Sequence, residues 1–392
     1  MSIFTSRPAA RWLAPVAVAA AVIGIGAGVN ALTASAAPNL PARSAAQLLV
    51  DLQTARLDGM SGTVVQTADL GLPALPFLGG QGSSNLTSLV SGQHTLRVWY
   101  AGPHSARIAL LGTLGESDII TNGTDLWLWD SRANTATHRT LPAHQGRADK
   151  GADKGLDPNA LPKTPQEAAD LAIAAISPST VVTTGSNARV AGRRAYELIL
   201  SPRDTASLVR EVRLAIDASQ HVPLRVQVFA RDLETPAFEV KFTAVSFKRP
   251  DPAQFTFTPP PGAKVIEEPT ATDKTPPDKA SPDKHAGAPN GQSGPPQVTV
   301  VGKGWTSVLV ARLPKDMTPA GGDAKGDSPG GLPILDALPT VSGSWGSGHL
   351  LRSRLFSVLL TDDGRLLVGA VSPERLQEVA GDPAAALKAP TK

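Results

Sequence analysis

The sequence predicts an α+β fold, in which two helices cover one long antiparallel sheet and a small α+β domain follows at the C-terminus. Three observations favour this fold: repeated alternation of apolar and polar residues, one strong hairpin signal, and only two helical patterns before residue 266. Because two helices must cover a long sheet, we expect either a closed barrel or a curved half-barrel with a hydrophobic concavity.

The alternation predicts a sheet with one dry and one wet face. The predicted dry face carries Leu214, Ile216, Val226, Val228, Val240 and Phe242. The residues between them are polar or charged, namely Arg213, Arg225, Gln227 and Lys241. Residues 95–100 alternate in the same way, with Leu96, Val98 and Tyr100 on one face.

Residues 118–130 predict a tight hairpin. Asn122-Gly123 favours the positive φ that a two-residue turn requires, and both flanks are apolar and β-prone. Trp127 and Trp129 share one face of the second strand. They are interpreted either as core residues or as an aromatic wall facing a ligand, because Leu126 and Leu128 make the opposite face apolar as well.

Two helices are predicted in this region. Ser44 and Gln47 form a weak capping box, apolar residues follow at helical spacing, and Gly59 ends the first helix. Thr164 caps the second, which has Pro165 at its first position and runs to residues 177–178.

The N-terminus predicts a secretion signal in residues 1–36. Arg7 and Arg11 precede an uncharged Ala/Val/Ile/Gly core, and Ala34-Ser35-Ala36 is a small-x-small cleavage site. The alternative is an uncleaved anchor, because residues 13–32 are long enough to span a bilayer. Either case places the chain outside the cytoplasm.

The composition of the remaining chain predicts two domains joined by a linker. Residues 37–266 are predicted to form the sheet domain and residues 298–392 the C-terminal domain. Residues 267–297 are rich in Pro, Asp, Lys, Gly and Ser, which predicts a disordered linker because few apolar groups are available for burial. The C-terminal domain is predicted to contain strands at 298–301 and 307–311, a hairpin across 356–371, and a final helix that begins after Ser372.

Several function classes are disfavoured. The chain has no cysteine, which excludes disulfides and thiolate chemistry. Its formal charge is +3, and removal of residues 1–36 with their two arginines leaves about +1, so nucleic acid is not expected as a partner. The seven histidines lack metal-ligand spacing. Asp362-Asp363-Gly364 is interpreted as a turn, and Ser344 and Ser347 lack the context of a hydrolase nucleophile.

Residues 70–90 place large apolar side chains among Gly, Pro, Ser and Asn. The segment is interpreted either as a loop whose apolar residues dock on the domain or as a flap over a barrel mouth, with Leu75, Phe77 and Leu78 at its centre. Apolar residues in a mobile loop cost solubility unless something covers them.

The order of these strand motifs resembles the periplasmic lipoprotein-carrier family LolA and its relative RseB across residues 40–266. The motifs that carry the resemblance are Gly62-Thr-Val-Val-Gln, Leu96-Arg-Val-Trp-Tyr, Arg107-Ile-Ala-Leu-Leu, Asn122-Gly-Thr-Asp-Leu-Trp-Leu-Trp-Asp, Gly192-Arg-Arg-Ala-Tyr-Glu-Leu, Leu214-Ala-Ile-Asp, Pro223-Leu-Arg-Val, Phe255-Thr-Phe and Pro260-Pro-Gly. The resemblance implies an incomplete antiparallel β-barrel with helices as a lid and acyl chains bound in its cavity. The insertion at 70–90, the loop at 142–164 and the second domain depart from a simple carrier.

We therefore expect a secreted or membrane-tethered, non-enzymatic protein of the bacterial cell envelope that buries lipid or lipoprotein acyl chains in a hydrophobic groove. Neither a cofactor nor a metal is expected. The alternative is a regulatory sensor similar to RseB, which binds lipid or lipoprotein and signals to a membrane anti-sigma partner. The predicted groove residues are Leu96, Val98, Tyr100, Trp127, Trp129, Leu214, Ile216, Val226, Val228, Val240 and Phe242.

Overall fold

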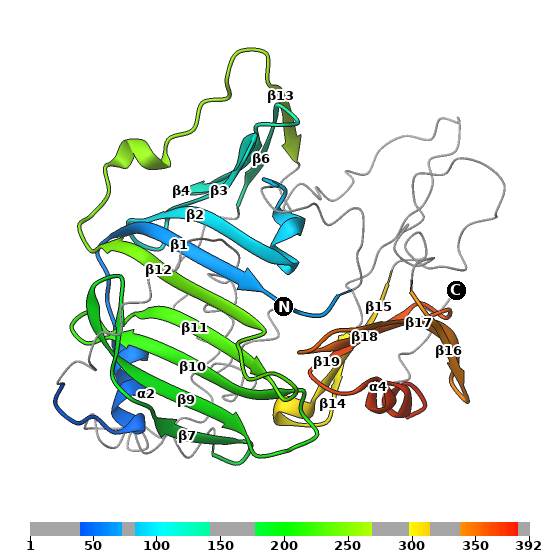
Figure 1. Ribbon diagram of the computed structural model, residues 1–392. Coiled ribbons are helices and arrows are strands. Elements are labelled where there is room, and N and C mark those ends of the chain that lie inside the picture. The colour runs from blue at the N-terminus through cyan, green and yellow to red at the C-terminus, as the bar shows by residue number, and fades with distance from the viewer. Residues whose placement is uncertain (1–39, 73–82, 142–176, 269–297, 314–337, 383–392) are drawn as a thin grey trace, which may run out of the picture. The chain divides into compact units, whose positions relative to one another are not determined.

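The computed structural model describes residues 40–72, 83–141, 177–268, 298–313 and 338–382 (Figure 1). The chain splits into two compact units, the first built from most residues up to 271 and the second from the residues after it plus the short segments 71–75 and 204–209. The predicted signal peptide, second helix and flap centre lie outside the described residues, as does nearly all of the predicted linker. The predicted domain boundaries stay a prediction.

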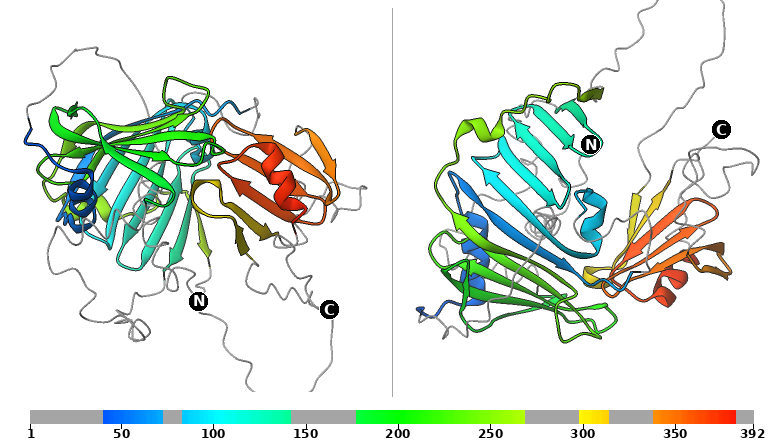
Figure 2. Two further views of the ribbon diagram at one scale, coloured as in Figure 1. Left: turned by 90° about the horizontal axis from the view of Figure 1, so that it is seen from below. Right: turned by 45° about the horizontal axis from the view of Figure 1, so that its top comes forward.

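The first unit is built on one large sheet, in the order β13-β6-β5-β4-β3-β2-β1-β12-β11-β10-β9-β7, with β8 paired to β9. Its strands are β1 (Met60–Ala68), β2 (Gly92–Tyr100), β3 (Ser105–Gly112), β4 (Gly115–Asn122), β5 (Asp125–Asp130), β6 (Thr135–Thr140), β7 (Thr180–Thr184), β8 (Ala188–Val190), β9 (Arg193–Pro202), β10 (Val209–Asp217), β11 (Pro223–Ala230), β12 (Phe238–Ser246) and β13 (Lys264–Glu268). Strands β13 and β7 end the sheet without pairing to each other, and Figure 2 shows it curved and open. The incomplete barrel is therefore confirmed, and a closed barrel is wrong.

The pairing of β1 with β12 joins the two halves of this sheet. Val64 lies opposite Phe242, and the register shifts between Thr63 and Val64. Gly62 allows this close approach, because a Cβ at that position would collide with the Ala244 carbonyl oxygen and the Phe242 ring. The glycine thus serves packing at a bulge, where close backbone approach favours a residue without a side chain.

The predicted hairpin is formed by β4 and β5. Asn122 pairs with Asp125, so the two turn residues are Gly123 and Thr124 rather than Asn122 and Gly123. Gly123 has a φ of 66°, the left-handed conformation that a glycine adopts without steric cost.

Helix α2 (Ala45–Thr54) confirms the first helical prediction, although it ends before the predicted stop at Gly59. Ser44 Oγ accepts the Gln47 N–H at 3.2 Å, and the Ser44 N–H donates to Gln47 Oε1 at 3.0 Å, which completes the capping box. Its buried residues are Leu48 and Leu49, and it packs against β7 and β9. Two short 3₁₀ helices, η2 (Leu86–Val90) and η4 (Pro252–Phe255), pack on β1 and β2 and on β3 and β4, respectively.

Asp217, at the end of β10, anchors the turn into β11. Its carboxylate is buried and pairs with Arg193, whose Nη2 donates to Oδ1 at 3.0 Å. The backbone N–H groups of Ser219 and Gln220 also donate to Oδ1, at 2.9 and 2.7 Å. Burial raises the pKa of Asp217, but these hydrogen bonds outweigh burial and hold the pKa below its usual value of 3.8.

This geometry predicts an acid dependence of stability. A carboxyl whose pKa is lowered on folding stabilises the folded state above its usual pKa, and that contribution is lost as pH falls through the lowered value. We expect Asp217→Asn to lower the free energy of unfolding at pH 7, with a smaller difference from wild type at pH 3. Urea unfolding of wild type and Asp217→Asn at both pH values measures this difference in the free energy of unfolding. An equal difference at both values would show that Asp217 does not act through its charge.

The second unit is a six-stranded antiparallel sheet with one helix on one face. Its strands, in the spatial order β14-β15-β19-β18-β17-β16, are β14 (Val298–Val301), β15 (Val308–Arg312), β16 (Thr340–Gly343), β17 (Gly346–Arg352), β18 (Ser357–Thr361) and β19 (Arg365–Gly369). A short 3₁₀ helix, η5 (Gly304–Thr306), precedes β15, and α4 (Pro373–Ala380) follows β19. Helix α4 and its Ser372 cap, the strands near 298 and 308 and the hairpin around residue 363 were predicted from the sequence, whereas β16 and β17 were not.

Candidate functional site: an apolar face of the large sheet

Strand register assigns the predicted groove residues to faces, because directly paired residues of antiparallel strands point to the same side. Leu96 pairs with Val64 on β1 and with Leu110 on β3, and Val64 pairs with Phe242 on β12. These side chains therefore share one face across four adjacent strands. On β11, Val226 continues the same face, because it pairs with Val240.

We call this surface the apolar face and define it by Val64, Leu96, Val98, Leu110, Val226, Val228, Val240 and Phe242. Tyr100 belongs to the same side of β2, two residues beyond Val98. Leu214 and Ile216 on β10 are buried and pair with Leu198 and Tyr196 on β9. Arg43, just before α2, lies 6.0 Å from the Tyr196 ring centroid, so this helical end covers the side of β9 that carries Tyr196.

Trp127 and Trp129 lie on the opposite face, which corrects their grouping with Leu96 and Val98. Trp129 pairs with Asp118, Asp118 pairs with Ala109, and Ala109 pairs with Arg97. Since Arg97 lies between Leu96 and Val98 in the strand, its face is the other one. Each tryptophan packs on Phe257, with centroids 5.3 and 5.8 Å away, and Trp127 also stacks on His138 at 4.3 Å.

Two buried polar side chains interrupt the apolar face at its β1–β2 end. Gln66 and His94 are direct register partners. Gln66 Nε2 donates to the Leu89 carbonyl at 2.7 Å, while His94 Nε2 lies 2.9 Å from the carbonyls of both Ser88 and Ser91. Carbonyl oxygens only accept, so His94 Nε2 carries the hydrogen. This pair fixes η2, whose own residues Leu86 and Leu89 pack on Leu96 and Leu110.

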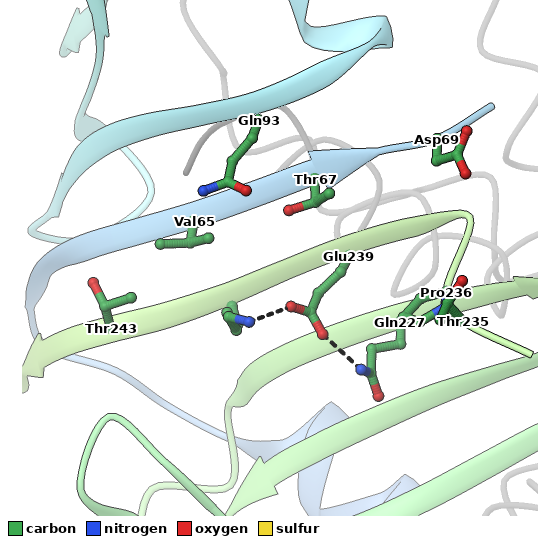
Figure 3. Close-up of a pocket in the computed structure, with 10 residues that line it drawn as sticks. Val65, Thr67, Asp69, Gln93, Gln227, Thr235, Pro236, Glu239 and Thr243 are labelled. Carbon is green, nitrogen blue, oxygen red and sulfur yellow. Dashed lines mark hydrogen bonds and ion pairs between the residues drawn. The ribbon is translucent and has the colours of Figure 1, made fainter. Parts of the chain in front are cut away.

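The opposite face contains a polar hollow of about 410 Å³. Figure 3 shows side chains of β1, β2, β11 and β12 around it. Glu239 accepts from Gln227 Nε2 at 2.6 Å and pairs with Lys241. The lining residues are Val65, Thr67, Asp69, Gln93, Gln227, Thr235, Pro236, Glu239, Lys241 and Thr243. This lining includes three charged side chains and two amides, which an acyl chain would strip of water, so the hollow is a poor site for an acyl chain.

The residues considered for catalysis have structural contacts. Asp363 accepts from Arg365 Nε at 2.8 Å beside Gly364, whose φ of 82° fits the predicted turn, and Ser347 donates to Asp362. Among the described residues, no group of three His, Asp or Glu side chains is placed to hold a metal ion. No helix in the described ranges is long and apolar enough to cross a membrane.

The groups that hold η2 and those around His138 were not predicted from the sequence. Gln66 and His94 stand at alternating positions of strands that otherwise read as apolar on that side, so a polar residue there was a usable signal. His138 lies in a polar strand, Thr135–Thr140, and its partner Glu267 is 129 residues away. Such a long separation leaves no local signal.

Comparison with known proteins gave structural likenesses alone. No protein-family model and no curated protein matches the chain. The complex of MucA and MucB from Pseudomonas aeruginosa is similar with a TM-score of 0.42 and 16% identity, covering 86% of this chain and 96% of that one. A structure of MucB in complex with MucA(peri) is similar with a TM-score of 0.39 and 17% identity, covering 86% of this chain and 94% of that one. A LolA superfamily protein from Nitrosomonas europaea is similar with a TM-score of 0.21 and 13% identity, covering 55% of this chain and 99% of that one. All three TM-scores lie below 0.5, so the fold rests on the strand order and register described above.

Proposed function

We propose that the chain is an extracytoplasmic binding protein that buries the acyl chains of a lipid or lipoprotein on the apolar face. The observation that carries the proposal is the continuity of this face over β11, β12, β1, β2 and β3. Val64, Leu96, Val226, Val240 and Phe242 on it are all buried, while Val98 and Val228 are half-buried.

Cover on this face is uneven among the described residues. Helix α2 packs against β7 and β9, outside these five strands, whereas η2 packs against β1 and β2. Val190 on β8 belongs to one buried cluster with Val64, Val240 and Phe242, so β8 covers part of β12. Val98 and Val228 remain half-buried, and an acyl chain laid on them would complete their burial.

Binding would draw its free energy from burial. Each CH₂ group removed from water contributes about 0.8 kcal/mol, so one long acyl chain supplies micromolar affinity or better after ordering costs. The flap residues Leu75, Phe77 and Leu78 would close over the bound chain, because they gain burial only when the groove is filled. This role for the flap follows from its composition and its place before η2.

A regulatory sensor is the second candidate. The second unit favours this candidate, because it has a core of its own, formed by Val308, Val310, Leu359, Leu367 and Leu376. Burial of an acyl chain in the first unit would not require such a second folded unit. In a sensor, ligand on the apolar face would change how the second unit binds a membrane-protein partner.

A fluorescent acyl probe tests the proposal. We expect wild type to bind the probe, Val98→Asn to bind it several-fold more weakly, and the triple Ser variant of Leu75, Phe77 and Leu78 to release it faster. Arg97→Gln is the matched control, because Arg97 is exposed on the opposite face of the same strand. Stopped-flow release and equilibrium titration provide the readouts.

Two outcomes would contradict the proposal. If wild type binds no acyl probe, the sheet is a protein-docking platform instead. If Arg97→Gln weakens binding as much as Val98→Asn, the probe does not lie on the apolar face.

A further inference from the structure

Strand β13 lies at the edge of the sheet and buries little apolar surface. It pairs in parallel with β6, whereas the neighbouring pairs β4–β5 and β5–β6 are antiparallel. Its apolar residues Val265 and Ile266 are 46% and 37% exposed, so burial contributes little to its docking. Glu267 and Glu268, the first two residues of the predicted linker, belong to this strand.

Side chains add to the backbone pairing of β13 with β6. His138 on β6 lies between two carboxylates: Nδ1 is 2.7 Å from Glu267 Oε2 on β13, and Nε2 is 3.0 Å from Asp125 Oδ1 on β5. Its ring stacks on Trp127 with an interplanar angle of 20°. The next residue, Arg139, pairs with Glu268, so two consecutive ion pairs tie β6 to β13.

The two contacts of His138 require a protonated ring. An ionised carboxylate only accepts hydrogen bonds, and a neutral imidazole has a single N–H to donate. A neutral ring would therefore leave one carboxylate against a nitrogen lone pair. The indole face of Trp127 adds attraction for a cation. Among the residues that the structure describes, the charged groups that face His138 are Asp125 from β5 and Glu267 from β13.

We propose that His138 is a pH-sensitive clasp that holds β13 on the sheet when protonated and releases it when neutral. Release would free the β6 edge and add the five residues of β13 to the chain segment that leads from residue 269 to β14. The clasp would thus make the length of the segment that connects the two units depend on pH. This inference is independent of acyl binding.

The direction of the pH effect follows from the contacts. Partial burial lowers the pKa of His138, but the hydrogen bonds that its ring donates to Asp125 and Glu267 outweigh burial, so the pKa is raised above its usual 6.5. A group with a raised pKa contributes its full stabilisation below the usual value and loses it as pH rises through the raised value. Docking of β13 should therefore be strongest in mild acid and weaken in mild alkali.

Hydrogen exchange of the full chain tests the clasp. We expect protection of the β13 amides, normalised to those of β12 in the same sample, to fall several-fold between pH 5.5 and pH 8.5. In His138→Gln the protection should be low and independent of pH, and Glu267→Gln should reduce the pH response. His104→Gln is the matched control, since His104 is exposed in the turn between β2 and β3.

The control should behave as wild type does. Equal β13 protection in wild type at both pH values would overturn the clasp. An unchanged pH response in His138→Gln would overturn it as well, because another group would then be responsible.

Discussion

Phe242→Ala should destabilise the first unit by about 3–5 kcal/mol, the cost typical of deleting a buried aromatic ring. Phe242 is 5% exposed and lies in one cluster with Val64 and Val240. Its ring also fills the space beside Gly62, at the bulge where β1 meets β12. The cavity would therefore open at the pairing that joins the two halves of the sheet. Hydrogen exchange in increasing urea measures the loss for each unit separately.

Thr243→Ala is the control for this prediction. Thr243 is the next residue on β12, exposed on the opposite face, and its hydroxyl donates to the Thr63 carbonyl at a long 3.3 Å. Exposed substitutions of this kind usually change stability by about 0.5 kcal/mol or less. Comparable losses in both variants would show that the β1–β12 junction, rather than burial of the ring, limits stability.

Arg365→Met should destabilise the second unit by about 2–4 kcal/mol. Arg365 is buried, and its Nη1 donates to the Ala380 carbonyl at 2.8 Å, at the end of α4. Its Nε binds Asp363 in the turn before β19. Methionine keeps the apolar stem but leaves a buried carbonyl without its donor. Half of Asp363 is exposed, so solvent compensates part of the lost ion pair.

Arg375→Met provides the comparison within the same unit. Arg375 pairs with Glu378 at 3.0 Å on the exposed side of α4, and an exposed pair of this kind contributes about 0–1 kcal/mol. Unit-resolved hydrogen exchange again gives the free energies. If both variants lose the same amount, Arg365 does not act by joining the turn to the helix end.

Sequence patterns predicted the features that depend on residues close together in the chain. The capping box at Ser44 and the alternation around Val226 and Val240 appear in the structure as predicted, because caps and strand faces depend on neighbouring residues. The positive φ of Gly123 was predicted for the same reason, although the turn begins one residue later. Pairings between distant strands, such as β6 with β13, carry no comparable signal.

The candidate site was predicted in part. Alternation separated the two faces of β2, β11 and β12, whereas in β10 Leu214, Ala215 and Ile216 are all buried. Alternation also did not say which face of one strand continues that of the next. That relation depends on inter-strand register, and it separates Trp127 and Trp129 from Leu96 and Val98. The expectation that the remaining groove residues bind a ligand is still a prediction, as is the absence of enzymatic activity.

Photo-crosslinking with a diazirine-labelled fatty acid tests the central claim most directly, because it reports where the acyl chain lies. The account predicts crosslinks to the apolar face, on peptides that carry Leu96, Val98, Val240 or Phe242, and competition by unlabelled fatty acid. Crosslinks confined to the polar hollow or to the face of Trp127 and Trp129 would contradict it, as would labelling that unlabelled fatty acid does not reduce.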